Sequence, residues 1–179
     1  MSSLDKFKPE KDFFIGIDSD GCVFDTMEVK HKEFFCPNTV KYFGLFAIAK
    51  YVRETWDFVN LYSVTRGTNR FPALIRVIDL LAQRPEVAER GVILPDVEPL
   101  RKWVAGENRL GNPVFREYVR ANPDPALERV LQWTMAVNED IAKWLRDTPP
   151  FPHAQKAIER LGQVADAIVV SQTPLEALA

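Results

Sequence analysis

Two short apolar segments near opposite ends of the chain constrain its fold more than any other feature. Residues 13–17 (FFIGI) lead directly into Asp18, and residues 167–170 (AIVV) lead directly into Ser171. Continuous apolar runs without polar alternation are typical of parallel strands that are covered on both faces. We therefore predict an α/β fold in which both ends of the chain contribute strands to one parallel sheet.

The long region between these segments has the pattern of helices. Asn112-Pro113 and Asp124-Pro125 each pair an N-cap residue with a proline in the first helical turn. Gly91, Gly106 and Gly162 follow periodic segments and predict helix ends. The predicted helices are 38–63, 72–83, 86–90, 97–105, 113–121, 125–147 and 152–161.

The amphipathic helices of this region need one another to bury their apolar faces, so we expect them to form a helical domain of their own. Four tryptophans among their apolar residues are expected in its core: Trp56, Trp103, Trp133 and Trp144. The predicted organisation is a first part of the α/β core at 1–25, a helical domain at 26–149 and a second part of the core at 150–179.

Composition narrows the class of protein. With 23 Lys+Arg against 25 Asp+Glu, the formal net charge is −2. This charge argues against a nucleic-acid partner, because proteins that bind nucleic acids normally carry an excess of basic residues. The two cysteines are too few for a disulfide framework. The start of the chain is polar and mixed in charge, unlike a signal peptide, and its apolar runs are too short to cross a bilayer. We therefore expect a cytoplasmic protein without a membrane partner.

The residues after the first predicted strand carry the strongest chemical signal. Asp18 and Asp20 are two apart, so in extended backbone they point to one side at the carboxyl end of the strand, where open α/β sheets bind ligands. Gly21 then lets the chain turn sharply. Two neighbouring carboxylates repel, and they are accommodated by binding a hard cation or by protonating one of them. Taken alone, the same spacing is also typical of an ordinary turn.

In this context the sequence resembles the haloacid dehalogenase (HAD) superfamily. Its first motif, an apolar strand followed by D-x-D-G-x-x-x-D, is matched by residues 18–25, and its second, an apolar strand ending in Ser or Thr, by residues 168–171. The segment 150–162 resembles the one that leads into the second motif, although His153 stands where many relatives have glycine. The resemblance implies a Rossmann-like parallel-sheet core, only partly present in this chain, with a large all-helical cap inserted after the first motif.

The resemblance also implies roles for individual residues. Asp18 would be the nucleophile, Asp20 the general acid/base, and the Asp18 carboxylate with the Asp20 backbone carbonyl would hold Mg²⁺. Ser171 would bind the transferring phosphoryl group, with Thr173 as a second candidate. Relatives that cleave phosphate esters typically have an Asp at the position of Asp20. The implied function is therefore a Mg²⁺-dependent phosphatase that acts on a small phosphorylated metabolite through an aspartyl-phosphate.

The loop at residues 63–70 is the most suggestive part of the helical region. Helical caps of this family often present Arg or Lys from such a turn to the substrate, which makes Arg66 and Arg70 candidates for binding a second anionic group. The alternative is a solvated turn between two helices that contains an N-cap residue.

The family's third and fourth motifs, a Lys or Arg and an acidic pair, would follow the second strand, and neither occurs in the eight residues after Ser171. We therefore expect the chain to be the first part of a longer enzyme. The alternatives are a phosphomutase or dehalogenase of the same superfamily, or a catalytically inactive binding or regulatory module. The sequence determines neither the substrate nor the oligomeric state.

Overall fold

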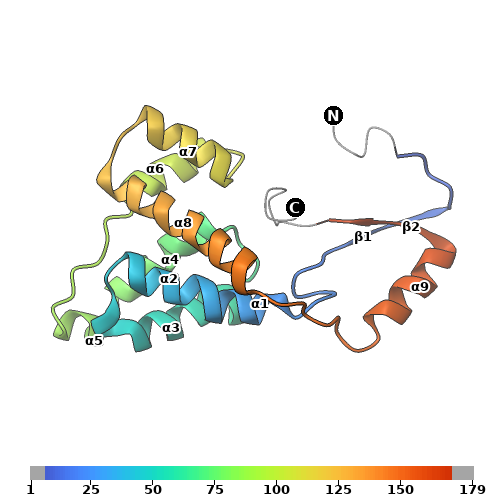
Figure 1. The fold of residues 1–179 in the computed structure, drawn as a ribbon, viewed down its shortest axis with the longest axis horizontal. Coiled ribbons are helices and arrows are strands. Elements are labelled where there is room, and N and C mark those ends of the chain that lie inside the picture. The colour runs from blue at the N-terminus through green and yellow to red at the C-terminus, as the bar shows by residue number, and fades with distance from the viewer. Residues whose placement is uncertain (1–6, 171–179) are drawn as a thin grey trace. The chain divides into compact units, whose positions relative to one another are not determined.

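A computed structural model describes residues 7–170 of the chain, which divide into two compact units (Figure 1). We call residues 7–27 and 147–170 the sheet unit, and residues 28–146 the helical unit. The sequence predicts boundaries between residues 25 and 26 and between residues 149 and 150. Most of the described chain is helical, and its two strands form a small parallel sheet.

In the sheet unit, strand β1 (Phe13–Ile17) pairs in parallel with strand β2 (Ala165–Val169). The register runs from Phe13 opposite Ala165 to Ile17 opposite Val169, which confirms the prediction that both ends of the chain contribute strands to one parallel sheet. Helix α9 (Ala154–Val164) leads directly into β2 (Figure 1). The predicted stop at Gly162 is wrong, because α9 continues to Val164 and β2 begins at Ala165.

Polar contacts hold the segment before β1 beside β2 and α9. The Asp166 carboxylate accepts hydrogen bonds from the backbone N–H groups of Glu10 and Lys11, at 2.8 and 3.1 Å. The Lys11 ammonium donates to the Gly162 carbonyl at the end of α9. A carboxylate that accepts two backbone N–H groups fixes its segment more firmly than one neutral contact would.

The apolar side chains of this sheet remain largely exposed within the described residues, so the prediction of strands covered on both faces is wrong for this part of the chain. Phe13 and Phe14 are 66% and 55% exposed, and Val169 is 71% exposed. Helix α9 has no buried residue. Two strands and one helix offer too little surface to bury both faces of a parallel sheet.

Segment 150–153 enters α9 through an unusual backbone conformation. His153, the N-cap residue of α9, has a φ of +70°, in the left-handed region that glycine adopts without a Cβ penalty. A glycine at this position would therefore adopt the observed backbone more readily than a histidine does.

The helical unit is built from α-helices interrupted by short 3₁₀ and π segments. Its elements, with α1 beginning in the sheet unit, are α1 (Thr26–Val29), η2 (Lys30–Phe35, π), α2 (Cys36–Tyr42), η3 (Phe46–Ile48, 3₁₀), α3 (Ala49–Asp57), η4 (Phe58–Tyr62, π), α4 (Arg70–Ala82), α5 (Pro85–Glu89), α6 (Glu98–Gly106), α7 (Asn112–Ala121) and α8 (Pro125–Trp144). The N-cap at Asp124 is confirmed, since its side chain accepts from the N–H groups of Ala126 and Leu127.

The single helix predicted over 38–63 is wrong, because the chain breaks after α2. Gly44 has a φ of +67° and the Leu45 N–H donates to the Val40 carbonyl at 2.9 Å, which closes the end of α2. The apolar periodicity resumes in α3 with nearly the same spacing, so the sequence pattern hides this break.

Aromatic side chains fill the core of the helical unit. Trp56 and Trp133 are fully buried, with their ring centroids 6.2 Å apart, and Phe35 packs against both. The Trp133 Nε1–H donates to the Thr39 hydroxyl at 3.1 Å, so this buried polar group is satisfied. The prediction of core tryptophans is confirmed for Trp56, Trp103 and Trp133 and is wrong for Trp144, which is 56% exposed at the end of α8.

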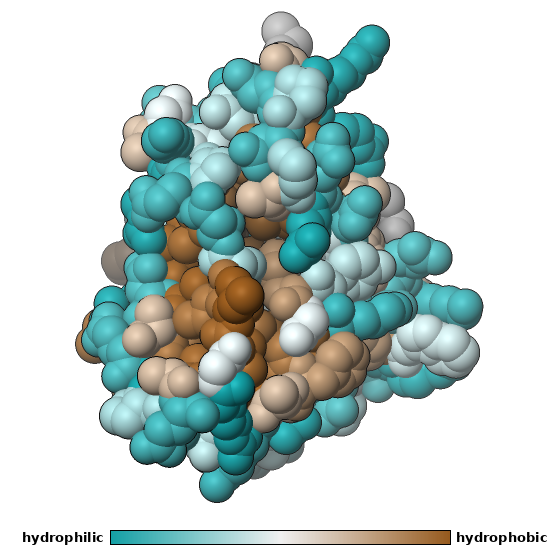
Figure 2. Space-filling view, turned by 90° about the vertical axis from the view of Figure 1, so that its left-hand side faces the viewer, coloured by the Kyte–Doolittle hydropathy of each residue, from teal (hydrophilic) through white to brown (hydrophobic). Residues whose placement is uncertain are grey.

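Helix α8 packs against α2, α6 and α7, and α4 packs against α3 and α6. On the face that Figure 2 shows, hydrophobic surface gathers near the centre and hydrophilic side chains surround it. Exposed apolar side chains of the helical unit include Phe46 and Ile93.

Candidate functional site

The two motif aspartates lie at the carboxyl end of β1. Asp18 is the first residue after the strand and is exposed, and Asp20 is partly buried in the loop that follows. The Ser19 carbonyl accepts from the N–H groups of Val23 and Phe24, both at 3.0 Å, and Gly21 adopts a φ of +74°. The loop is therefore a tight, internally bonded turn in which a glycine is required.

Thr26 holds the second aspartate. Its hydroxyl donates a hydrogen bond to Asp20 Oδ1, and Thr26 itself is buried as the first residue of α1. The sequence analysis missed this residue. The available signal was a hydroxyl side chain immediately after Asp25, the last residue of the motif. Its contact makes Thr26 a residue that orients the Asp20 carboxylate.

Strand β2 ends beside the same edge of the sheet. The Val170 N–H donates to the Ile17 carbonyl at 2.8 Å, which brings the end of β2 next to the residue that precedes Asp18. Gly16 allows this approach, because a Cβ atom there would lie 2.9 Å from Val170 Cγ2. Ser171 and Thr173, the two predicted phosphate-binding residues, lie outside the described residues.

The two candidate arginines of the 63–70 loop differ in their surroundings. The Arg70 guanidinium donates to Asn138 Oδ1 at 2.6 Å and to Thr134 Oγ1 at 3.1 Å, and it lies over the Phe35 ring. These contacts anchor Arg70 against α8. Arg66 is exposed in a turn, and its guanidinium makes a long contact, 3.4 Å, to the Leu61 carbonyl.

The same loop contains the helix cap that the alternative interpretation requires. Asn69 is the N-cap residue of α4, and its side chain accepts from the Phe71 N–H at 3.1 Å. The loop is thus a capped turn between helices, and the substrate-binding roles of Arg66 and Arg70 stay predictions.

A polar cluster that the sequence did not reveal connects η2 with the end of η4. The Tyr62 hydroxyl donates to Glu28 Oε1 at 2.7 Å, and the Lys32 ammonium donates to the Tyr62 oxygen at 3.0 Å and pairs with Glu28. The hydrogen bond from Lys32 is the main reason why the pKa of the Glu28 carboxyl lies below its usual value. The cluster links residues that are far apart in sequence.

Asp57 precedes η4, and its charge interacts with those of Glu28 and Lys32 in this cluster. Its Oδ1 is buried and has no hydrogen-bond partner among the described residues. Burial raises the pKa of Asp57, an effect to which the Glu28 charge adds and which Lys32 and Arg53 oppose. Asp57 is therefore a carboxylate of the helical unit whose buried oxygen accepts no hydrogen bond from the described residues.

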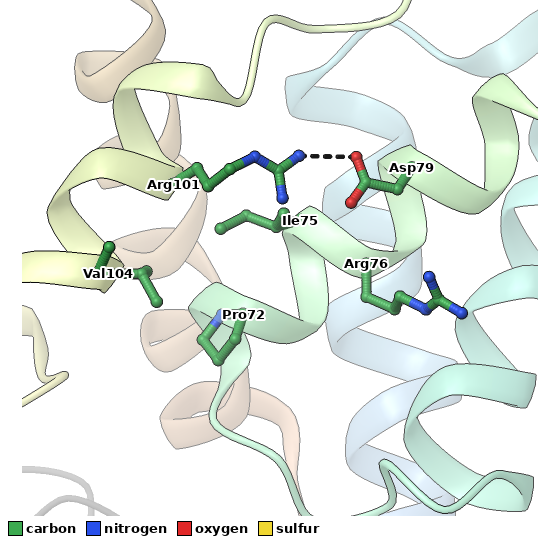
Figure 3. A pocket seen from close by; sticks show the side chains of 7 residues that line it. Pro72, Ile75, Arg76, Asp79, Arg101 and Val104 are labelled. Carbon is green, nitrogen blue, oxygen red and sulfur yellow. Dashed lines mark hydrogen bonds and ion pairs between the residues drawn. The ribbon is translucent and has the colours of Figure 1, made fainter.

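A shallow hollow lies elsewhere on the helical unit, between α4 and α6 (Figure 3). It measures about 330 Å³ and its lining is mainly apolar, with Pro72, Ile75 and Val104 along it. Arg101 reaches across to Asp79 at 2.8 Å and also bonds Glu98, so its charge is compensated. Neither motif aspartate lines the hollow, and its lining provides apolar surface rather than the predicted catalytic carboxylates.

The described residues contain no group of three or more His, Cys, Asp or Glu side chains arranged to hold a metal ion. The cation site predicted at Asp18 and Asp20 stays a prediction. Comparison of the chain with models of protein families, with curated proteins and with solved structures finds no significant match. Within residues 7–170, no helix has the length and apolar character needed to cross a bilayer.

Proposed function

We propose that this protein is an HAD-like hydrolase, a Mg²⁺-dependent phosphatase that acts on a small phosphorylated metabolite. The observation that carries the proposal is the position of Asp18, exposed and directly at the carboxyl end of β1 in a parallel pair. Asp20 follows two residues later with its carboxylate held by Thr26. In this proposal the sheet unit belongs to a Rossmann-like core and the helical unit is its cap.

The chemistry needs two carboxylates with different roles. The Asp18 carboxylate attacks phosphorus in line, the ester P–O bond breaks, and protonated Asp20 gives its proton to the leaving oxygen. Asp20 then takes a proton from water, which attacks the aspartyl-phosphate, releases inorganic phosphate and restores Asp18. Thr26 supports both steps, because its hydrogen bond limits the positions that the Asp20 carboxylate can adopt.

The residues fit the cation that the family resemblance implies. Asp18 offers a carboxylate and Asp20 a backbone carbonyl, and Mg²⁺ prefers oxygen ligands from one or two carboxylates together with water and substrate oxygens. When bound there, the ion would neutralise charge on the phosphoryl group.

The test is a screen of phosphate monoesters with the full-length gene product and Mg²⁺, with release of inorganic phosphate as the readout. Asp18→Asn should lower turnover by at least ~10³-fold, because an amide cannot form the covalent intermediate. Asp12→Asn is the matched control, since Asp12 is exposed at the other end of β1 and should be dispensable. Turnover that survives Asp18→Asn would contradict the mechanism.

Product analysis separates the alternatives. A phosphomutase returns an isomer of the substrate and no free phosphate, whereas a dehalogenase releases halide from a haloacid. A binding or regulatory module shows no turnover of any ester and retains its ligand affinity after Asp18→Asn. Each of these results would replace the proposed phosphatase function.

A further inference from the structure

The side chain of Met135 in α8 makes an unusual set of contacts. It is 36% exposed, and its sulfur lies 3.2 Å from an Arg116 guanidinium nitrogen and 3.8 Å from Asn112 Nδ2. Both neighbours are hydrogen-bond donors, whereas a thioether sulfur is a weak acceptor. A charged donor and an amide donor therefore converge on an atom that satisfies neither of them well.

A contact other than the sulfur holds Asn112, one of the two donors, in place. Asn112 and Arg116 are four residues apart on α7, so they project from the same face of that helix. Asn112 is buried, and its Oδ1 accepts from the Thr134 hydroxyl at 2.7 Å. Since the amide oxygen is engaged by Thr134, the amide N–H₂ group must point towards Met135.

An oxygen atom on this sulfur would change the balance of the site. Conversion to the sulfoxide turns a weak acceptor into a strong, polar one, and in an ordinary apolar core this change is disruptive. Here the new oxygen would lie beside the buried Asn112 amide and the Arg116 guanidinium, and partial exposure of Met135 gives a small oxidant access to its side chain.

We propose that Met135 is an oxidation site that accepts an oxygen atom from a hydroperoxide and whose sulfoxide is stabilised by Arg116 and Asn112. A sulfur lone pair attacks one peroxide oxygen, so an S–O bond forms and the O–O bond breaks. Sulfur is oxidised by two electrons as the peroxide is reduced. The departing oxyanion, hydroxide from hydrogen peroxide or alkoxide from an alkyl hydroperoxide, takes the proton of the transferred oxygen and leaves as water or as an alcohol. This site is independent of the proposed phosphatase function.

The experiment oxidises the full chain with hydrogen peroxide in a Met27→Leu background, which removes another oxidisable methionine, and follows Met135 by peptide mass mapping. Thermal unfolding is then compared before and after oxidation. We expect oxidation of Met135 to raise the unfolding midpoint by about 3 °C, the order expected for new hydrogen bonds in a unit of this size. In Arg116→Leu, oxidation should lower the midpoint instead, because one donor is lost.

Two further variants complete the design. Arg116→Lys retains a charged donor and should restore part of the rise in the unfolding midpoint. Met135→Leu lacks the oxidisable sulfur but retains both cysteines, so the absence of an oxidation-dependent shift in this variant would show that cysteine oxidation does not cause it. The proposal is overturned if Met135 resists peroxide that oxidises Met27 in the natural chain, or if oxidation lowers the midpoint equally with and without Arg116.

Discussion

The helical unit and the sheet unit both contain large apolar side chains, but they differ in how far these side chains are buried. In the helical unit Trp56, Phe71 and Trp133 are fully buried, whereas Phe13 and Val169 of the sheet unit are mostly exposed. Helices bury their apolar faces by packing against one another, whereas a parallel sheet needs further layers that cover both of its faces. The comparison shows that the helical unit contains its own core, and that the described sheet unit does not.

The two cysteines give the largest expected contrast between the units. Cys22 is exposed in the motif loop, while Cys36 is buried at the start of α2, where burial raises the pKa of its thiol to about 12. Only the thiolate reacts, so at pH 8 Cys36 should be alkylated at least ~10³-fold more slowly than Cys22. Mass mapping after timed exposure to iodoacetamide measures both rates. Equal rates would show that the helical unit opens readily.

A pair of aromatic truncations should give the next largest contrast. Trp133→Ala removes a fully buried ring and should lower the free energy of unfolding of the helical unit by about 3–5 kcal/mol. Phe14→Ala in β1 removes a ring that is 55% exposed and should change the free energy of unfolding of the helical unit by less than ~0.5 kcal/mol.

Urea titration followed by tryptophan fluorescence and circular dichroism measures both variants. Binding of a hydrophobic dye supplies an independent readout, because Phe14→Ala should decrease it if the exposed sheet is the binding surface. A large loss of stability from Phe14→Ala would contradict the comparison.

The smallest expected effect concerns Asp57. Because burial raises its pKa above the unfolded value, folding favours the protonated carboxyl, and its contribution to stability is lost as the pH rises through the folded pKa. Asp57→Asn removes the charge, so it should slightly raise the unfolding midpoint at pH 7 and leave it unchanged at a pH below the ordinary Asp pKa. Glu117→Gln, on the exposed side of α7, is the control. A lower midpoint at pH 7 would show that the charged form is stabilised.

The candidate site was only partly accessible to sequence analysis. The positions of Asp18 and Asp20 after a strand follow from local pattern, because strand period and turn residues are encoded within a few positions. The contact of Thr26 with Asp20 depends on how the loop folds back on itself. The contact of Tyr62 with Glu28 joins residues 34 positions apart, and no local signal specifies it.

The helices show the same division between local and distant causes. The Asp124 cap places the start of α8 correctly, because capping satisfies N–H groups that lie within one turn. The predicted cap at Asn112 is wrong, since Asn112 is the first residue of α7, its N-cap is Gly111 and no side chain caps this helix. The break after α2 escapes the same reasoning, since Gly44 is also tolerated inside a helical pattern.

By itself the sequence determined that the chain is mainly helical with an apolar strand near each end and that an Asp pair follows the first strand. These features depend on periodicity, turn chemistry and short-range sterics, which a linear pattern records. Only the tertiary structure decided that Arg70 is anchored on α8, that the Met135 sulfur faces two donors and that the described sheet lies exposed. Burial and hydrogen-bond partners depend on which distant segments pack together, and a local pattern does not contain that information.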